Sequence, residues 1–156
     1  ASDVGFSTCL HRHPENFWNP AFQFHPNTAM AVAGVVLVAG HPANHRGFIE
    51  RFAGMHELST TSAGILFKTP RGTIEVVTPS AYVDRFGTSP PDSARGARLA
   101  ALRFAVRDPG VAEAVFKKAA IRYTRHGDGL VVGPDVAMGS SLVFGLDCRQ
   151  PATRCS

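Results

Sequence analysis

The sequence predicts an α+β fold in which two βαβββ units follow one another along the chain. The main evidence is a pattern that occurs twice: VAGVVLVAGHP at 32–42 resembles LAALRFAVRDP at 99–109, and GTIEVV resembles GSSLVF. Pro42 and Pro109 lie 67 residues apart, and so do Gly72 and Gly139. The expected elements also occur in the same order in both halves. A constant offset of this kind indicates a duplicated supersecondary unit.

The first unit, residues 29–79, opens with an apolar run and ends with three short strands. Val32–Ala39 is typical of a buried strand, and His41–Pro42 interrupts it. Apolar residues at helical spacing then predict a helix over Ala43–Ala53. Glycine and proline residues separate the three strands expected after it, which are His56–Thr60, Ala63–Phe67 and Thr73–Thr78.

The second unit, residues 98–147, repeats this order. Asp108 is the expected N-cap of its helix, and Pro109 occupies the first helical position, where a missing N–H has no cost. Residues 80–97 are rich in proline, glycine and serine and are expected to connect the units, and residues 148–156 form a tail. The expected elements are a strand at Leu99–Val106, a helix at Val111–Ala120, and strands at Arg122–His126, Leu130–Val132 and Ser141–Gly145.

Two such units in tandem resemble the vicinal oxygen chelate superfamily. Each unit begins with an apolar strand ending in an "[DH]P" turn and closes with a strand that follows the "G-x-x-E-[VL]" type, which GTIEVV matches in full and GSSLVF matches except for Leu142 in place of Glu. The superfamily includes glyoxalase I-like lyases, extradiol dioxygenases, and fosfomycin and bleomycin resistance proteins. The resemblance covers residues 29–147 and implies a curved mixed sheet, shaped as two half-barrels, with a cavity between its halves.

The resemblance also implies a divalent metal held by side chains on the first and last strands of each unit. The matching positions are Gly34 and Ala101 on the first strands, and Glu75 and Leu142 on the last, with Val143 in place of Leu142 if the register shifts by one. Only Glu75 carries a metal-binding atom. Because one carboxylate cannot hold a divalent ion, the usual metal site is expected to be largely missing.

Arg103 is the other candidate in the cavity. Strand alternation places it on the cavity face with small alanines, and the large side chains of Leu99–Val106 on the opposite face. Glu75 is expected to face the same cavity as Arg103. The guanidinium of Arg103 could bind a carboxylate or phosphate on a ligand, or could pair with Glu75 across the barrel, and the sequence leaves both open.

Residues 1–28 belong to neither unit. They resemble the junction in tandem glyoxalase-like proteins, where a closing strand leads through a "QH-x-x-PE-x-x-W-x-P" stretch into "HPN". That resemblance implies that the chain corresponds to the C-terminal half of a longer tandem protein. Gly5–Leu10 would then be a strand that pairs with this sheet or with a second copy, because an unpaired strand seeks a partner edge.

His11 and His13 form an i, i+2 pair in this segment. Together with Glu75 they are a possible donor set for Zn, Mn, Fe or Ni. The alternative is a proline-rich loop in which the histidines cap turns and the aromatic side chains clamp the loop onto the barrel. The cofactor is therefore either none or a divalent metal ion.

Composition favours a globular domain that binds a small molecule. The chain has 156 residues, 44% of them apolar, and a net charge of +4 that is spread along it without aromatic interleaving. We therefore expect no nucleic-acid partner, and no apolar run is long enough for a membrane span. Three cysteines without a metal-binding spacing favour a cytoplasmic setting. The expected protein partner is a second copy or an upstream glyoxalase-like domain.

Two functions remain from the sequence. The first is a metal-free protein that binds a small, anionic metabolite between the units, using Arg103 and Glu75. The alternative is a metal-dependent lyase, isomerase or dioxygenase, with Glu75 moving a proton and the metal site completed by His11, His13 or a partner chain. The sequence does not decide whether the protein is an enzyme.

Overall fold

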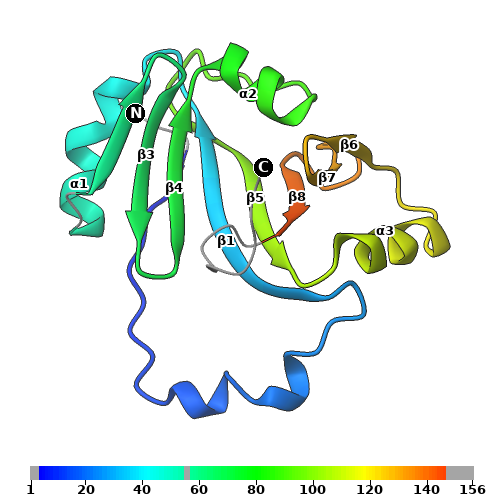
Figure 1. The fold of residues 1–156 in the computed structure, drawn as a ribbon. Coiled ribbons are helices and arrows are strands. Elements are labelled where there is room, and N and C mark those ends of the chain that lie inside the picture. Colours follow the sequence, from blue (N-terminus) through cyan, green and yellow to red (C-terminus); the bar gives the residue numbers. More distant parts are fainter. Residues whose placement is uncertain (1–3, 55–56, 147–156) are drawn as a thin grey trace.

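A computed structural model of the chain describes residues 4–54 and 57–146 and confirms the α+β fold. Eight strands form one curved mixed sheet in the order β2-β3-β4-β1-β5-β8-β7-β6 (Figure 1). The strands are β1 (Ala29–Val38), β2 (Leu58–Thr61), β3 (Gly64–Thr69), β4 (Gly72–Val77), β5 (Arg98–Val106), β6 (Thr124–His126), β7 (Gly129–Val132) and β8 (Ser141–Gly145). The α-helices are α1 (Arg46–Ala53), α2 (Pro79–Phe86) and α3 (Pro109–Lys118).

The strand order reflects the predicted duplication. Each unit pairs its first and last strands in parallel, β1 with β4 and β5 with β8, and the units join through antiparallel β1 and β5. Val35 pairs with Leu102, the residue 67 positions later. On either side of it, Gly34 pairs with Arg103 and Val36 pairs with Ala101. Ala101 is the equivalent of Gly34 in the second unit, and Arg103 is the equivalent of Val36, so the two flanking pairs are equivalent to each other. An approximate two-fold axis therefore passes through the Val35–Leu102 pair.

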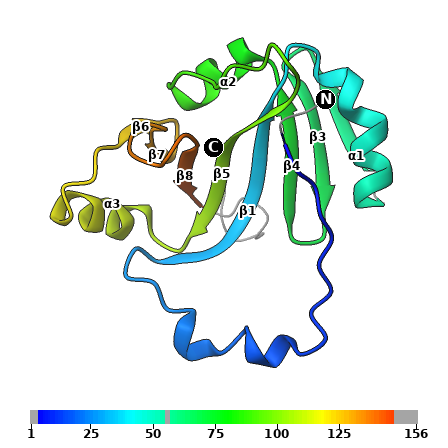
Figure 2. The ribbon, with the colours of Figure 1, turned by 180° about the vertical axis from the view of Figure 1, so that it is seen from behind.

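Helices cover both faces of the sheet. On the outer face, α1 packs on Leu37 and Phe67 through Ile49, and α3 packs on Phe144 through Phe116. Figure 2 shows these two helices at opposite ends of the sheet. On the inner face, α2 packs on the side chains that alternate with those beneath α1: Val36, Val38 and Val77. The helix α2 thus occupies part of the concave side of the sheet.

The helix α2 lies in the segment that the sequence analysis treated only as a connector. The side chain of Thr78 accepts a hydrogen bond from the Ala81 N–H at 3.2 Å, and Pro79 occupies the first helical turn. Gly87 ends the helix with φ +62°, in the left-handed region where glycine is favoured. The second unit begins its helix in the same way, since Asp108 caps α3 as predicted. The proline in Thr78–Pro79 therefore starts a helix rather than a loop.

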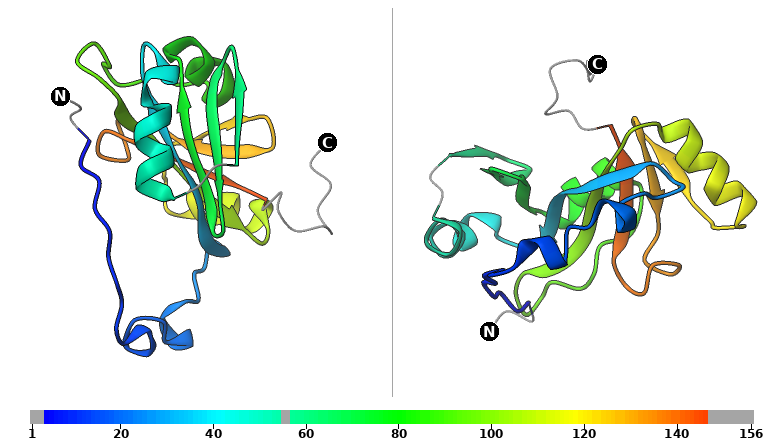
Figure 3. Two further views of the ribbon diagram at one scale, coloured as in Figure 1. Left: turned by 90° about the vertical axis from the view of Figure 1, so that its left-hand side faces the viewer. Right: turned by 90° about the horizontal axis from the view of Figure 1, so that it is seen from below.

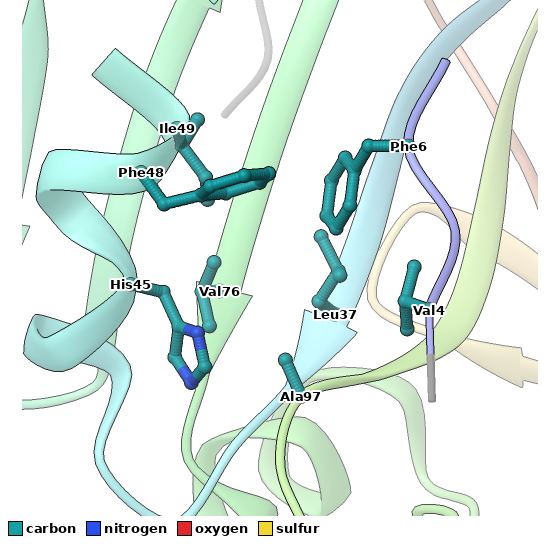
Figure 4. A pocket seen from close by; sticks show the side chains of 8 residues that line it. All are labelled: Val4, Phe6, Leu37, His45, Phe48, Ile49, Val76 and Ala97. Carbon is teal, nitrogen blue, oxygen red and sulfur yellow. The ribbon is translucent and has the colours of Figure 1, made fainter. Parts of the chain in front are cut away.

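The first described residues pack on the outer face without forming a strand. No strand lies between Val4 and Pro26 in the described chain, so Gly5–Leu10 does not pair with this sheet. Instead the Phe6 ring meets the rings of Phe48 and Phe52 on α1, with centroid distances of 4.9 and 5.3 Å. Figure 4 shows Phe6 facing Phe48 across a small apolar pocket. Pairing of this segment with a second copy stays a prediction.

The segment that follows stands away from the body. We call Ser7–Pro26 the arm; it contains the short 3-10 helices η1 (Pro14–Asn16) and η2 (Pro20–Phe22) and leads into β1 (Figure 3). A third 3-10 helix, η3 (Pro42–His45), leads into α1. The described chain has no helix with the length and apolar character that crossing a bilayer requires. The predicted tail at 148–156, with Cys148 and Cys155, lies outside the described residues, as does His56 at the predicted start of β2.

A buried hydroxyl pair ties α2 to the second unit. Tyr82 is 1% exposed, and its hydroxyl lies 3.0 Å from the Ala100 carbonyl oxygen on β5 and 2.8 Å from Ser141 Oγ on β8. Burial raises the pKa of the Tyr82 phenol above its ordinary value, against a smaller lowering by the Ser141 hydrogen bond. A neutral Tyr82 therefore fastens the connector helix onto two strands of the other unit.

Replacing Tyr82 with phenylalanine is expected to lower the free energy of unfolding by about 1–2 kcal/mol, because the buried Ser141 hydroxyl loses its partner. Urea unfolding followed by circular dichroism measures the loss. Adding Ser141→Ala to the Tyr82→Phe variant should lower the free energy of unfolding by less than Ser141→Ala lowers it in the parent protein. Equal decreases in the two backgrounds would show that the two hydroxyls are not coupled.

A second polar cluster joins α3 to β6. The Glu113 carboxylate accepts hydrogen bonds from Arg125, at 3.1 Å from Nε, and from the Tyr123 hydroxyl at 2.6 Å. Lys117 adds an ion pair at 3.5 Å. The Arg125 hydrogen bond, followed by that of Tyr123, lowers the pKa of Glu113 from 4.5 to about 2. The ionised carboxylate is therefore the form that the fold stabilises.

The stabilisation from Glu113 is expected to depend on pH with a definite sign. The pKa of Glu113 is lower in the folded protein, so its contribution is complete above the ordinary value of 4.5 and is lost as the pH falls toward about 2. Urea unfolding of the parent protein and Glu113→Gln at several pH values tests this. The stability difference between them should be constant at neutral pH and shrink across that acidic range. A difference that does not change with pH would contradict the assignment.

Candidate functional site

The candidate site is centred on Glu75, in the middle of β4 on the concave face. Its neighbours Ile74 and Val76 point to the opposite face and pack in the α1 core, so strand alternation directs Glu75 inward. Glu75 is 2% exposed and is the only charged side chain among the buried residues of the described chain. A buried carboxylate is costly unless charged or polar groups compensate it.

Two arginines compensate Glu75, one on each carboxylate oxygen. Arg103 Nη1 on β5 donates to Glu75 Oε1 at 2.6 Å, and Arg85 Nη1 on α2 donates to Glu75 Oε2. The sequence analysis left open whether Arg103 pairs with Glu75, and the structure forms that pair. Arg85 was not anticipated, because it lies in the connector. The sequence signals for a helix start at Thr78–Pro79 and for a helix end at Gly87 could have predicted α2. They could not have predicted that the Arg85 side chain points toward Glu75.

The cluster carries more positive than negative charge. Glu75 neutralises one of the two guanidinium groups, so the three side chains together carry a charge of +1. The Arg85 and Arg103 side chains are 42% and 32% exposed, whereas the Glu75 side chain is 3% exposed. The surplus positive charge therefore faces solvent, and the carboxylate is hidden behind it.

Two hollows in the concave face meet at these arginines. One, of about 280 Å³, lies toward the first unit and is bordered by Thr61, Thr73 and Glu75. The other, of about 220 Å³, lies toward the second unit and is bordered by His126 and Asp128. Both are lined by Arg85 and Arg103. A molecule in either hollow would contact the two guanidinium groups.

The metal positions implied by the resemblance can now be located. Val36 and Arg103 are equivalent positions in the two units; Val36 pairs with Glu75, and Arg103 pairs with Val143. The counterpart of Glu75 in the second unit is therefore Val143, which is the alternative with the register shifted by one. Gly34 has no space for a side chain, since an added Cβ would lie 2.3 Å from Thr73 Oγ1 and 2.9 Å from the Thr73 carbonyl oxygen. Of these positions only Glu75 supplies a donor, and arginines already occupy both of its oxygens. This set of residues does not fit a divalent ion.

The structure does not bring His11 and His13 to Glu75. The His11 ring packs against Phe17 in the arm, with centroids 4.7 Å apart, and His13 Nδ1 lies 3.2 Å from Glu15 Oε1. Between residues 4 and 146, outside the gap at 55–56, no three His, Cys, Asp or Glu side chains are grouped as metal ligands. Completion of a metal site by a partner chain stays a prediction.

The apolar pocket of Figure 4 is separate from this site. It has a volume of about 250 Å³, lies on the outer face, and is lined by apolar side chains and His45. Its wall residues Leu37 and Val76 alternate with Val36 and Glu75, which point to the concave side. The pocket lacks the charged groups that the concave hollows share.

Comparison with known proteins places the fold. No family model and no curated protein matches the sequence. Among solved structures, methylmalonyl-CoA epimerase from Mycobacterium tuberculosis aligns with a TM-score of 0.57 at 11% identity, covering 81% of this chain and 93% of that chain. A hypothetical protein from Bacillus halodurans C-125 aligns with a TM-score of 0.55 at 11% identity, covering 78% and 97%.

A third similar structure belongs to a larger enzyme. Homoprotocatechuate 2,3-dioxygenase from Brevibacterium fuscum, in a substrate complex, aligns with a TM-score of 0.52 at 21% identity. The match covers 74% of this chain and 36% of that chain, so the chain spans about a third of the dioxygenase. The chain has the vicinal oxygen chelate fold. At these identities the similarity establishes the glyoxalase-like architecture, and the chemistry depends on the chain's own residues.

Changing Glu75 to glutamine is expected to lower the free energy of unfolding by about 1–3 kcal/mol. The substitution keeps the shape but removes the charge between Arg85 and Arg103, which then repel each other, although water screens part of this effect. Urea unfolding followed by circular dichroism measures the change. Glu57→Gln, which removes an exposed ion pair with Lys68, is the matched control and should change stability by less than about 0.5 kcal/mol. Similar losses in both variants would contradict a structural role for the cluster.

Proposed function

We propose that this protein binds a small anionic molecule on the concave face of its sheet, through Arg85 and Arg103. The observation that supports the proposal is the surplus positive charge of the Glu75 cluster, which borders two hollows and is open to water. A guanidinium group binds carboxylate or phosphate through paired hydrogen bonds. A ligand carrying either group would satisfy the donors that Glu75 leaves free.

Glu75 has a positioning role in this proposal. Each of its oxygens holds one arginine, so the carboxylate fixes the direction of both guanidinium groups before a ligand arrives. Such preorganisation reduces the entropy lost on binding. Two guanidinium groups held near one point would recognise a planar carboxylate or a phosphate better than a neutral molecule.

The hollows favour a small ligand with some polar character. Three of the residues that line the hollow toward the first unit carry hydroxyl groups: Ser59, Thr61 and Thr73. The other hollow is bordered by Phe86, His126 and Asp128, and the Asp128 carboxylate offsets part of the positive charge there, so the hollow toward the first unit suits an anion better. Volumes near 220 and 280 Å³ suit a metabolite of low molecular weight. The metal-dependent alternative has less support, because two arginines beside Glu75 would repel a divalent cation.

Inorganic phosphate and malonate are suitable probes for the proposed site. Isothermal titration calorimetry of the purified protein should detect binding, and Arg103→Ala or Arg85→Ala should weaken it about 10- to 100-fold, the loss expected for one or two charged hydrogen bonds. Arg122→Ala is the matched control, since Arg122 pairs with Asp135 at the surface and lines neither hollow. It should bind both probes as the parent protein does.

Two results would decide against the proposal. One is an absence of binding by either probe at low ionic strength, where electrostatic attraction is strongest. The other is binding that requires added Zn²⁺, Mn²⁺, Fe²⁺ or Ni²⁺ and disappears with a chelator, which would favour the metal-dependent alternative. Titration in the presence of a chelator separates the two functions.

A further inference from the structure

The arm presents an unusual amount of apolar surface to water. Every residue from Ser7 to Pro26 is exposed. Clusters of exposed apolar side chains of this kind usually mark an interaction site. The five large apolar side chains and their exposed fractions are Leu10 82%, Phe17 65%, Trp18 56%, Phe22 76% and Phe24 82%.

The arm is held in shape by its own contacts. Asn19 caps η2 by accepting the Ala21 N–H at 3.0 Å, and the Trp18 N–H donates to the Pro14 carbonyl at 3.0 Å. In the described chain, none of the arm's hydrogen bonds, ion pairs or ring contacts reaches the sheet or its α-helices. The expectation that the aromatic side chains clamp this segment onto the barrel is therefore wrong, because they point into water.

Both ends of the arm are anchored to the body. Phe6, just before it, packs on α1, as Figure 4 shows, and β1 follows shortly after it. Figure 3 shows the arm as a loop that leaves the body and returns to it. Anchoring at both ends limits the conformations of the arm, so less entropy is lost when a partner binds.

The start of β1 extends this apolar surface. β1 pairs with β5 from Ala29 onward but with β4 only from Gly34, so the β4 side of Ala29–Val32 is an open edge in the described chain. Met30 and Val32, on this stretch, are 45% and 52% exposed. An open strand edge with apolar side chains is a template for pairing with another chain. The arm and the edge are continuous.

We propose that the arm and the open edge of β1 form the interface through which two copies of this chain associate. A standard interface uses about 20–30 residues from each partner, and the arm with Met30 and Val32 is of that size. Arg12 and Glu15 cancel, so the arm has no net charge when its histidines are neutral, while the whole chain carries +4. A neutral apolar surface suits another copy of itself better than a nucleic acid or an anionic membrane.

The only tryptophan of the chain, Trp18, lies in the arm and reports on association directly. Sedimentation velocity should show a monomer–dimer equilibrium, and the Trp18 emission maximum should move to shorter wavelength as protein concentration rises. The double change Phe22→Ser and Phe24→Ser should give a monomer whose emission no longer depends on concentration. Circular dichroism should be unchanged, because neither side chain packs on the body.

Met138→Ser is the control, since Met138 is fully exposed at 100% but lies in the loop before β8. This variant should dimerise like the parent protein. A parent chain that stays monomeric at about 100 µM would overturn the proposal and leave the arm for a different protein or another part of a longer polypeptide. A dimer that survives the double change would overturn it as well. If the double variant misfolds, acrylamide quenching of Trp18 in the parent protein at low and high concentration gives the same test.

Discussion

The antiparallel pairing of β1 with β5 is the interaction on which the rest of the molecule depends. It joins the two units through equivalent strands and sets the concave face of one beside that of the other. Gly34 lies opposite Arg103, and Val36 lies beside Glu75, so the Glu75–Arg103 ion pair spans β1 on that face. The cluster of Glu75, Arg85 and Arg103 therefore forms only because β1 and β5 join the two units, and neither unit contains it alone.

The asymmetry between the units gives the cluster its surplus positive charge. Glu75 belongs to the first unit, and its counterpart in the second is Val143, so the approximate two-fold axis relates a carboxylate to an apolar side chain. Arg103 has the same relation to Val36. One carboxylate and two arginines leave a positive remainder, which is the opposite of what a bound metal cation requires. The same fold can therefore carry either kind of site, depending on a few inward-facing positions.

The sequence predicted the architecture because the duplication leaves a regular trace. A fixed offset identifies equivalent strands, and alternation along them directs Arg103 and Glu75 to the same face. Arg85 was not predicted as a site residue because it lies between the two repeats, where no equivalent segment in the other unit helps to assign a helix. The one-residue shift from Leu142 to Val143 could be proposed but not chosen, since loop lengths differ between the units. The route of residues 4–26 depends on the packing of Phe6 against α1, a tertiary contact that local pattern does not reveal.

The crowding at Gly34 has a consequence for how this cavity could change. A histidine introduced at that position would collide with the side chain and the backbone of Thr73. A metal centre would therefore need a new ligand at Gly34, a repositioned β4 at Thr73, further ligands at Ala101 or Val143, and removal of the arginines that hold Glu75. No one of these changes alone supplies the several ligands that a divalent ion requires. A change from the present polar cluster to a metal centre would therefore require several coordinated substitutions on three strands and on α2.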